Sequence, residues 1–284
     1  MQRSASLTLV AIFALSVFVL LVAYAVLRED RGGRLTVSFL DVGQGDAIFI
    51  DAPSGRQVLI DGGKGPVVLE QLARVMPWWD KTIDVVIATH PDADHIGGLV
   101  DVLERYKVAR VVASSVEGDT GVATSFDEAI RAEGAVTLEA QRGQRFELGK
   151  GVRLDVLFPD RDVPHIPTND GSTVARLVYG ETDFILTGDA PQGVEEYLAA
   201  LDGEALRADV LKAGHHGSDT SSSPIFLGYV SPAYGVYSRG CDNSYGHPAP
   251  EVVARFAQLT IPTLDTCTEG TITFVSDGRV LSLR

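Results

Sequence analysis

Cysteine and basic residues are the scarce components of this 284-residue chain. It contains two cysteines, Cys241 and Cys267, and no Cys-x-x-Cys pair, which excludes a thiolate zinc site. Lys and Arg number 24 against 38 Asp and Glu, for a net charge of −14, which argues against a general polyanion-binding surface. A nuclease built on this chain would therefore need a local basic patch or a metal ion to hold phosphate.

Charge is absent altogether from one long run, Leu7 to Leu27. As a helix rising about 1.5 Å per residue, this run can cross a hydrocarbon core of roughly 30 Å. Two interpretations remain open: an uncleaved signal anchor, or a secretory signal peptide with an A-x-A-like cleavage site at residues 23–25. We favour the anchor, because the run is longer than the apolar region of a usual signal peptide.

Both interpretations divide the chain in the same way. Residues 1–33 form an anchor or signal peptide plus a linker, and residues 34–284 form a body that lies outside the cytoplasm, membrane-anchored or secreted. In that compartment Cys241 and Cys267 could form a disulfide, and two unpaired buried thiols are the alternative.

The body alternates short apolar runs with helical patterns, and no linker splits it into separate domains. The first three apolar runs indicate an antiparallel meander. We expect strands at residues 35–40, 47–50, 58–60, 83–88, 108–113, 146–148, 152–158, 173–179, 184–187, 208–212, 233–237, 272–275 and 280–283, and helices at 67–76, 99–106, 126–132, 194–201 and 251–258. Two similar halves of strands with helices predict two packed sheets with helices outside, an α/β fold.

The richest cluster of potential metal ligands follows the predicted strand at residues 83–88. His90, Asp92, Asp94 and His95 fall within six residues, in the run His-Pro-Asp-Ala-Asp-His. Imidazole nitrogens and carboxylate oxygens crowded at the end of a strand suit divalent cations of borderline or hard character. The alternative is a polar loop whose carboxylates cap the next helix, but capping needs one oxygen and no imidazole.

Further polar motifs stand beside other apolar runs of the body. Together they predict a site built from loops at one edge of two sheets. These motifs are Asp41 to Asp46, Asp61 to Gly63, Asn169 to Ser172, Leu186 to Asp189, Lys212 to Ser218 and Asn243 to His247.

In combination, DVGQGDA, LIDGG, THPDADHIGGL, LTGD, KAGHHGS and YGHP resemble the motifs of metallo-β-lactamase-fold hydrolases. Within that superfamily the chain is similar to the hydrolase domain of the ComEC-like late-competence proteins, over roughly residues 34 to 284. The resemblance implies a four-layer αββα sandwich with one or two divalent metal ions at the sheet edges.

Carried over by motif, the resemblance implies two metal positions. His90 and Asp92 would serve the first and Asp94 and His95 the second, with Asp189 as a bridging carboxylate. His215 matches the terminal ligand, and the neighbouring His216 is the competing choice, otherwise a substrate contact.

The motif departs from the superfamily at two places. Asp92 replaces the usual second histidine, which shifts the metal preference from zinc toward manganese or magnesium. The usual histidine before Asp189 is missing; Asn169 stands near its place as a substrate contact, with His165 close by. A single-metal or metal-free site is therefore the alternative.

The remaining roles are interpretations of single residues. The resemblance implies that Asp94 orients the metal-activated water. Lys212 at the rim would neutralise a phosphate oxygen, unless it is a solvated lysine. His247 would donate to the leaving oxygen or merely cap a helix. Asp46 and Asp61 would hold ligand imidazoles or serve turns. Substrate contacts are expected from Ser218, Asn243 and Tyr245.

These features predict a metal-dependent hydrolase, a phosphodiesterase or nuclease, acting on a phosphodiester or nucleic acid. Hydrolysis of a carbon ester, lactone or lactam is the alternative, and a non-catalytic metal-binding domain is a third. The acidic composition favours a small diester over long nucleic acid. The oligomeric state is not predicted.

Overall fold

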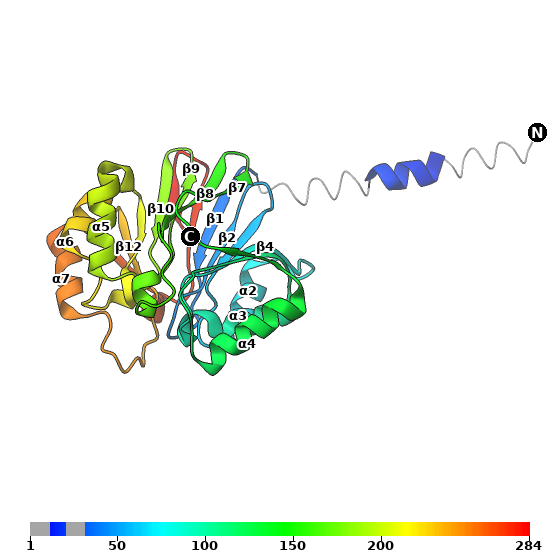
Figure 1. Ribbon diagram of the computed structural model, residues 1–284. Coiled ribbons are helices and arrows are strands. Elements are labelled where there is room, and N and C mark those ends of the chain that lie inside the picture. Colours follow the sequence, from blue (N-terminus) through cyan, green and yellow to red (C-terminus); the bar gives the residue numbers. More distant parts are fainter. Residues whose placement is uncertain (1–11, 21–31) are drawn as a thin grey trace, which may run out of the picture.

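The computed structural model describes residues 12–20 and 32–284, and its body contains two sheets (Figure 1). One sheet has eight strands in the order β15-β14-β1-β2-β3-β4-β5-β6, and the other has seven in the order β13-β12-β11-β10-β9-β8-β7. The first sheet contains β15 (Leu281–Leu283), β14 (Ile272–Ser276), β1 (Leu35–Phe39), β2 (Ile48–Asp51), β3 (Gln57–Ile60), β4 (Thr82–Ala88), β5 (Lys107–Ala113) and β6 (Val136–Glu139). The second contains β13 (Thr263–Asp265), β12 (Tyr234–Tyr237), β11 (Val210–Lys212), β10 (Thr182–Leu186), β9 (Val174–Tyr179), β8 (Val152–Phe158) and β7 (Arg145–Gly149).

Helices cover the outer faces of both sheets (Figure 1). The first sheet carries α2 (Val67–Val75), α3 (Ala93–Arg105) and α4 (Gly121–Glu133), and the second carries α5 (Gln192–Asp202), α6 (Pro224–Val230) and α7 (Pro250–Gln258). The short α8 (Thr266–Glu269) and the 3₁₀ turns η1 (Thr168–Gly171), η2 (Gly203–Leu206) and η3 (Gly214–Gly217) lie in connections.

Three apolar cores hold these layers together. Between the sheets, the ring of Phe274 from β14 lies 6.1 Å from that of Phe39 and 6.0 Å from that of Phe184 on β10, in edge-on contacts. The other two cores join helices to sheets, for example through Leu99 on one side and Phe226 on the other. This arrangement confirms the predicted two-sheet α/β fold with helices outside.

Burial follows the sequence pattern of each strand. In β4, Val85 and Ile87 face the core between the sheets, while Val86 and Ala88 face the helices. A parallel strand buried on both faces therefore reads as a continuous apolar run. In β8, Val152 and the alternate residues that follow it are buried and the residues between are half-buried, the period-two pattern of a strand with one face in the core between the sheets.

Most expected elements form within two or three residues of their expected bounds, and β1, β2 and β3 form the predicted antiparallel meander. The expected helices at 99–106 and 126–132 begin earlier, at Ala93 and Gly121. Elements β6, β13, α6 and α8 were not expected. In β6 three of four residues are exposed, so the strand carries no apolar alternation for a sequence pattern to reveal.

The cysteines pair: Cys241 and Cys267 form a disulfide with their Cα atoms 4.9 Å apart. The bond ties the loop after β12 to α8, which decides between the two alternatives that the sequence left open.

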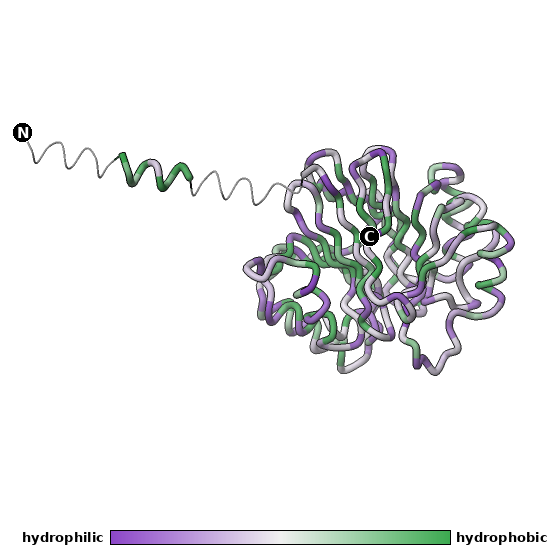
Figure 2. Tube along the Cα trace, turned by 180° about the vertical axis from the view of Figure 1, so that it is seen from behind, coloured by the Kyte–Doolittle hydropathy of each residue, from purple (hydrophilic) through white to green (hydrophobic). Residues whose placement is uncertain are grey.

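The described part of the predicted membrane segment, residues 12–20, is helical and its side chains are exposed; Figure 2 shows it as mainly hydrophobic. Within residues 12–20 and 32–284, no helix has both the length and the apolar character to cross a membrane. The rest of the predicted run Leu7 to Leu27, including the possible cleavage site, lies outside the described residues.

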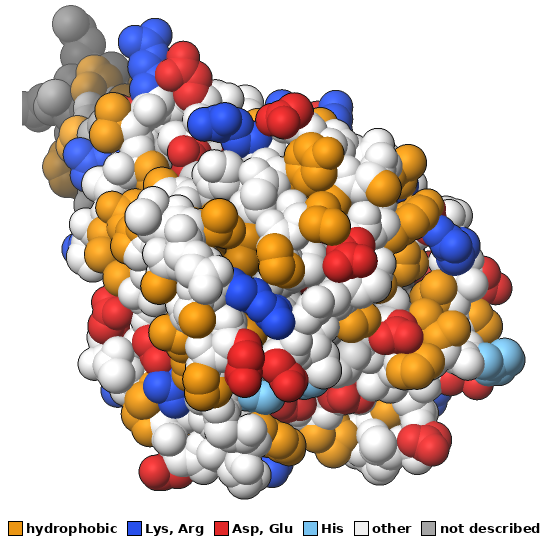
Figure 3. All heavy atoms as spheres, turned by 90° about the vertical axis from the view of Figure 1, so that its left-hand side faces the viewer, with side chains coloured by type: hydrophobic (Ala, Val, Ile, Leu, Met, Phe, Trp, Pro, Cys, Tyr) orange, Lys and Arg blue, Asp and Glu red, His pale blue; other side chains and the backbone are white. Residues whose placement is uncertain are grey.

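The surface of the body mixes both signs of charge. On the face that Figure 3 presents, Lys and Arg side chains are scattered among Asp and Glu, and the described residues form no continuous basic patch there.

Candidate metal centre

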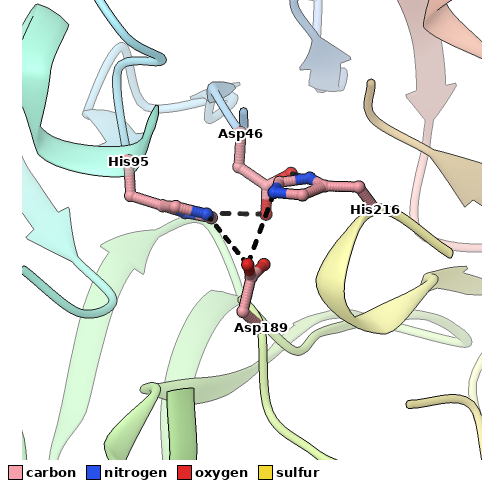
Figure 4. A group of neighbouring side chains, drawn as sticks. All are labelled: Asp46, His95, Asp189 and His216. Carbon is pink, nitrogen blue, oxygen red and sulfur yellow. Dashed lines mark ion pairs between the residues drawn. The ribbon is translucent and has the colours of Figure 1, made fainter. Parts of the chain in front are cut away.

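The polar loops named above meet at one edge of the two sheets. Strands β1, β3 and β4 run in the same direction in one sheet, as do β10, β11 and β12 in the other. Their carboxyl ends carry Asp46, Asp61 and the His90–His95 run from the first sheet, and Asp189 and the His215–His216 pair from the second. Figure 4 shows Asp46, His95, Asp189 and His216 pointing toward one another from these separate elements.

One carboxylate oxygen is the hub of the cluster. Asp189 Oδ2 lies 3.2 Å from His95 Nε2, 3.4 Å from His216 Nε2, 3.6 Å from His215 Nε2 and 3.9 Å from His90 Nε2. Four imidazole nitrogens around one buried oxygen match the place expected for a bridging carboxylate.

The inward nitrogens are available as ligands. The Nε2 atoms of His90, His95 and His216 are buried and have no hydrogen-bond partner among the described residues. A buried polar atom without a partner costs about 1–3 kcal/mol, so three at one point call for a further group. A divalent cation fits, because it takes the lone pairs of neutral imidazoles and the charge of carboxylates together.

The opposite nitrogen of each ring is held by the protein. His95 Nδ1 lies 2.8 Å from Asp61 Oδ2, and His216 Nδ1 lies 2.8 Å from the carbonyl oxygen of Ser238. His90 Nδ1 lies 3.0 Å from Thr89 Oγ1 and 3.2 Å from Ser172 Oγ. For His95 and His216, acceptors at Nδ1 put the proton there and turn the Nε2 lone pair inward, as metal ligands require.

Two further carboxylates divide the cluster into two positions. Asp92 Oδ2 lies 3.6 Å from His90 Nε2, and Asp94 Oδ2 lies 3.5 Å from His216 Nε2. Asp92 occupies the cap position of α3 but makes no side-chain capping hydrogen bond within the described body. The helix-capping alternative therefore does not explain this carboxylate.

His216, rather than His215, is the deeper of the two candidate ligands. Its ring is 1% exposed and stacks 5.2 Å from that of His95, whereas the His215 side chain is 28% exposed. Both residues have a positive φ, 48° and 56°, a strained conformation that directs two consecutive rings toward the centre. Asn169 Nδ2 lies 3.4 Å from His215 Nδ1.

Lys212 does not stand at the rim. It is fully buried, because it ends the buried strand β11, and its Nζ lies 2.5 Å from Asp46 Oδ2 and donates to the carbonyl oxygen of Gly188 at 2.7 Å. Its Nζ is also 3.4 Å from Asp189 Oδ1. The ammonium therefore neutralises carboxylates beneath the centre and is not solvated.

Asp46 and Asp61 both contact imidazoles of the cluster. Asp46 Oδ1 lies 3.3 Å from His216 Nδ1, on the side away from the cluster. Asp61 has a φ of 58°, so it serves its turn, and its carboxylate also accepts the backbone N–H and the hydroxyl of Thr89. Asp61 therefore combines the two roles between which the sequence did not decide.

The pKa shifts of the cluster show that its carboxylates stabilise positive charge on the neighbouring imidazoles. Burial lowers the pKa of the His216 imidazole, but the carboxylates of Asp189 and Asp46 outweigh it and hold that pKa well above its usual value. His95 behaves alike, with burial opposed by Asp189 and Asp61. Without a metal ion, protons on these rings compensate the carboxylates; a divalent cation can take their place.

The rim residues form a separate group. The His247 ring lies 5.6 Å from that of His215, and Tyr245, which is 69% exposed, stacks on His247 at 5.7 Å. His247 does not cap α7, whose cap residue is Ala249. The side-chain amide of Asn243 bonds to the loop backbone: its Nδ2 donates to the carbonyl oxygens of Gly240 and His247, and its Oδ1 accepts from the N–H of His247.

Two expected residues stay outside the cluster. Ser218 is buried and its hydroxyl pairs with that of Thr220 at 2.9 Å. The side chain of His165 is 78% exposed and its nearest recorded charge is that of Glu117, at 3.6 Å.

Sequence reasoning missed the residues that hold the imidazoles from behind and a cavity beside them. Thr89 and Ser172 adjoin recognised motifs, whereas Ser238 acts through its backbone oxygen and leaves no side-chain signal. A cavity of about 360 Å³ adjoins His90 and Pro91. Its walls are mainly apolar, with two acidic residues: Ala88, Ile96, Ala113, Ser114, Val116, Glu117, Gly118, Ala123, Phe126 and Asp127.

Comparisons with known proteins agree with this geometry. Residues 40–240 match the family model described as the metallo-beta-lactamase superfamily. The chain is 32% identical over 263 residues to ComE operon protein 3 of Bacillus subtilis (strain 168), covering 86% of this chain and 33% of that one. It is 32% identical over 242 residues to competence protein ComA of Neisseria gonorrhoeae, covering 84% and 32%.

The chain thus spans about a third of the length of these curated relatives. Among solved structures, the metallo-beta-lactamase fold protein YhfI from Bacillus subtilis superposes with a TM-score of 0.57 at 12% identity, covering 85% of this chain and 100% of that one. At that identity the likeness concerns the fold alone.

Proposed function

The chain belongs to the metallo-β-lactamase superfamily, as its motifs predicted, and from that premise we propose that it is a metal-dependent hydrolase of phosphodiester bonds. One observation carries the proposal: three unpartnered imidazole nitrogens converge on the hub oxygen of Asp189, and the carboxylates of Asp92 and Asp94 lie 3.6 and 3.5 Å from two of these nitrogens. So many carboxylates favour hard cations such as manganese or magnesium over zinc, and these suit phosphate oxygens.

Residues His90, Asp92 and Asp189 would hold one ion, and Asp94, His95, His216 and Asp189 a second. When bound, such ions polarise a phosphoryl oxygen and lower the pKa of a water molecule toward neutrality. We assign Asp94 to orient the attacking water, because its carboxylate lies 3.5 Å from His216 Nε2 in the centre and its side chain is partly exposed to solvent. The ammonium of Lys212, beneath the centre, holds the carboxylates of Asp46 and Asp189 in position by ion pairing.

We assign His247 to serve the leaving group. Burial lowers the pKa of its imidazole, and the neighbouring His215 and His216 lower it further, which favours the neutral ring. A neutral imidazole donates one N–H, which a departing oxygen can accept. Asn243 positions His247 through the loop backbone, and Tyr245 supports its ring.

The surroundings favour a compact diester over long nucleic acid. The cavity beside His90 has apolar walls and a volume within the range of small-molecule sites. Glu117 and Asp127, which also line it, would repel a polyanionic strand. The scattered charges of Figure 3 offer no track for such a strand on that face.

We also propose that the body lies outside the cytoplasm, attached to a membrane through the run Leu7 to Leu27 or secreted after its cleavage. The charge-free length of that run supports attachment, and the disulfide supports an oxidising compartment. The relatives named as competence proteins motivate DNA as one diester to test.

The test is hydrolysis of bis-p-nitrophenyl phosphate and of a DNA strand by the full chain in mild detergent. The protein is stripped with a chelator, and manganese, magnesium or zinc is added back singly. Diester cleavage should return with metal and fall by at least about a hundredfold in Asp94→Asn. Asp101→Asn, on the same helix but away from the centre, is the matched control.

The outcomes separate the hypotheses. Cleavage of the small diester but not of DNA identifies a small-diester hydrolase, and cleavage of both identifies a nuclease. Bound metal without cleavage of either would overturn the proposal and favour a carbon-ester hydrolase, to be tried on p-nitrophenyl acetate, or a non-catalytic domain.

A further inference from the structure

Two adjacent tryptophans are exposed in the turn between α2 and β4. Trp78 is 80% exposed, more than any other large hydrophobic residue of the described body, and Trp79 is 47% exposed. Their rings meet edge-on at 5.6 Å. Leaving such large aromatic surfaces in water does not stabilise the fold. Their exposure therefore points to a contact with something outside the chain.

The turn lies at the edge of the sheet opposite the metal centre. Strands β1 and β4 run in the same direction, so their amino ends, Leu35 and Thr82, share one edge and their carboxyl ends share the catalytic edge. Three strand spacings separate β1 from β4, roughly 15 Å. The seven residues of β4 span roughly 23 Å between the two edges.

The charge-free run Leu7 to Leu27 precedes β1, whose first residue lies at this same edge. Residues 28–34 connect Leu27 to β1 and can reach roughly 23 Å when extended. A bilayer that holds the run would therefore come within reach of the tryptophan turn. This step rests on the membrane attachment proposed above.

The chemistry of the turn suits the headgroup level of a bilayer. Tryptophan is enriched at membrane interfaces, where its apolar ring and polar N–H are both satisfied. Lys81, which follows the pair, holds its ammonium 5.0 Å from the ring centre of Tyr106, and Arg34 begins the body at the same edge. The nearby carboxylate of Asp80 is engaged by Thr82 and Gln57.

We propose that the Trp78–Trp79 turn inserts into the interfacial region of a phospholipid bilayer and directs the metal centre away from it. The catalytic edge then faces water, more than twenty ångströms from the lipid by the length of β4. The substrate of the proposed hydrolase is accordingly a water-borne diester and not a lipid of the same membrane.

The chain offers an unusually direct test, because Trp78 and Trp79 are its only tryptophans. The full chain is reconstituted into phosphatidylcholine vesicles, and tryptophan fluorescence is compared with and without brominated phosphatidylcholine. We expect the emission to shift to shorter wavelength on reconstitution and to be quenched by the brominated lipid. The single variants Trp78→Phe and Trp79→Phe report each ring alone, and Trp78 should be quenched more.

A reporter at the other edge is the matched control. Tyr245→Trp in the Trp78→Phe/Trp79→Phe background should remain accessible to aqueous iodide and unaffected by brominated lipid.

Flotation and diester hydrolysis are measured on the same preparations. A chain that floats with vesicles but shows no brominated-lipid quenching overturns the turn's role alone. A chain that does not float overturns the attachment and with it this inference, whereas lost hydrolysis concerns only the proposed reaction.

Discussion

Removing the buried ammonium of Lys212 should destabilise the protein far more than removing an exposed lysine. In Lys212→Met the side chain stays unbranched and apolar in its stem but loses the charge that lies 2.5 Å from Asp46 and 3.4 Å from Asp189. Both carboxylates are buried, so water cannot replace the lost partner.

The magnitude follows from the environment of the pair. Breaking a buried ion pair by removing one partner typically costs about 3–5 kcal/mol, because the other charge stays buried and uncompensated. The matched control is Lys107→Met: the Lys107 side chain is 68% exposed and pairs with Glu133 at 2.8 Å. An exposed pair of this kind contributes at most about 1 kcal/mol.

The assay is urea unfolding of the chelator-treated protein, followed by circular dichroism. Neutralising the partner as well, in Asp46→Asn/Lys212→Met, should recover part of the loss. A Lys212→Met variant that loses no more than Lys107→Met would refute the assignment of Lys212 as the compensating charge beneath the centre.

Three further predictions concern a glycine, a buried acid and the cavity. Gly45→Ala places a Cβ 1.9 Å from the carbonyl oxygen of Asp94 and should abolish metal binding, measured by elemental analysis. Gly43→Ala shares the strain of a positive φ, 76°, but its Cβ meets no described atom within 4 Å apart from its chain neighbours, so this variant should retain metal. Burial raises the pKa of Glu195 to about 7 against backbone hydrogen bonds that lower it. This acid binds its proton more tightly when folded, so its contribution to stability is present below about pH 4.5 and is lost as the pH rises through 7. In Glu195→Gln the urea midpoint of unfolding should therefore depend less on pH between about 4.5 and 7. An unchanged pH dependence in this range would contradict the role of Glu195. Ala123→Phe should fill the cavity and raise KM for bis-p-nitrophenyl phosphate at unchanged metal content; an unaltered KM would remove the cavity from the substrate site.

Much of the fold was predictable because its signals are local. Alternating or continuous apolar runs identified β1 to β5 and most of the second sheet, since burial on one or two faces imposes those patterns. Element β6 escaped because it lies at a sheet edge, where mostly exposed residues leave no pattern.

The sequence by itself determined which potential ligands gather in the first half of the candidate centre. His90, Asp92, Asp94 and His95 are neighbours along one strand–loop–helix connection, so their proximity needs no knowledge of the rest of the fold. With two cysteines in the chain, it also determined the partner of any intramolecular disulfide, though not that it forms.

Only the tertiary structure decided which side chains face the centre and how deeply. The positive φ of two consecutive histidines brings His216 inward and leaves His215 nearer solvent. Lys212 lies beneath the candidate ligands because its strand is an interior strand of the second sheet, and Asp46 reaches it only because the two sheets pack face to face. Ring direction and depth depend on backbone dihedrals and on contacts between segments more than a hundred residues apart, which no local pattern encodes.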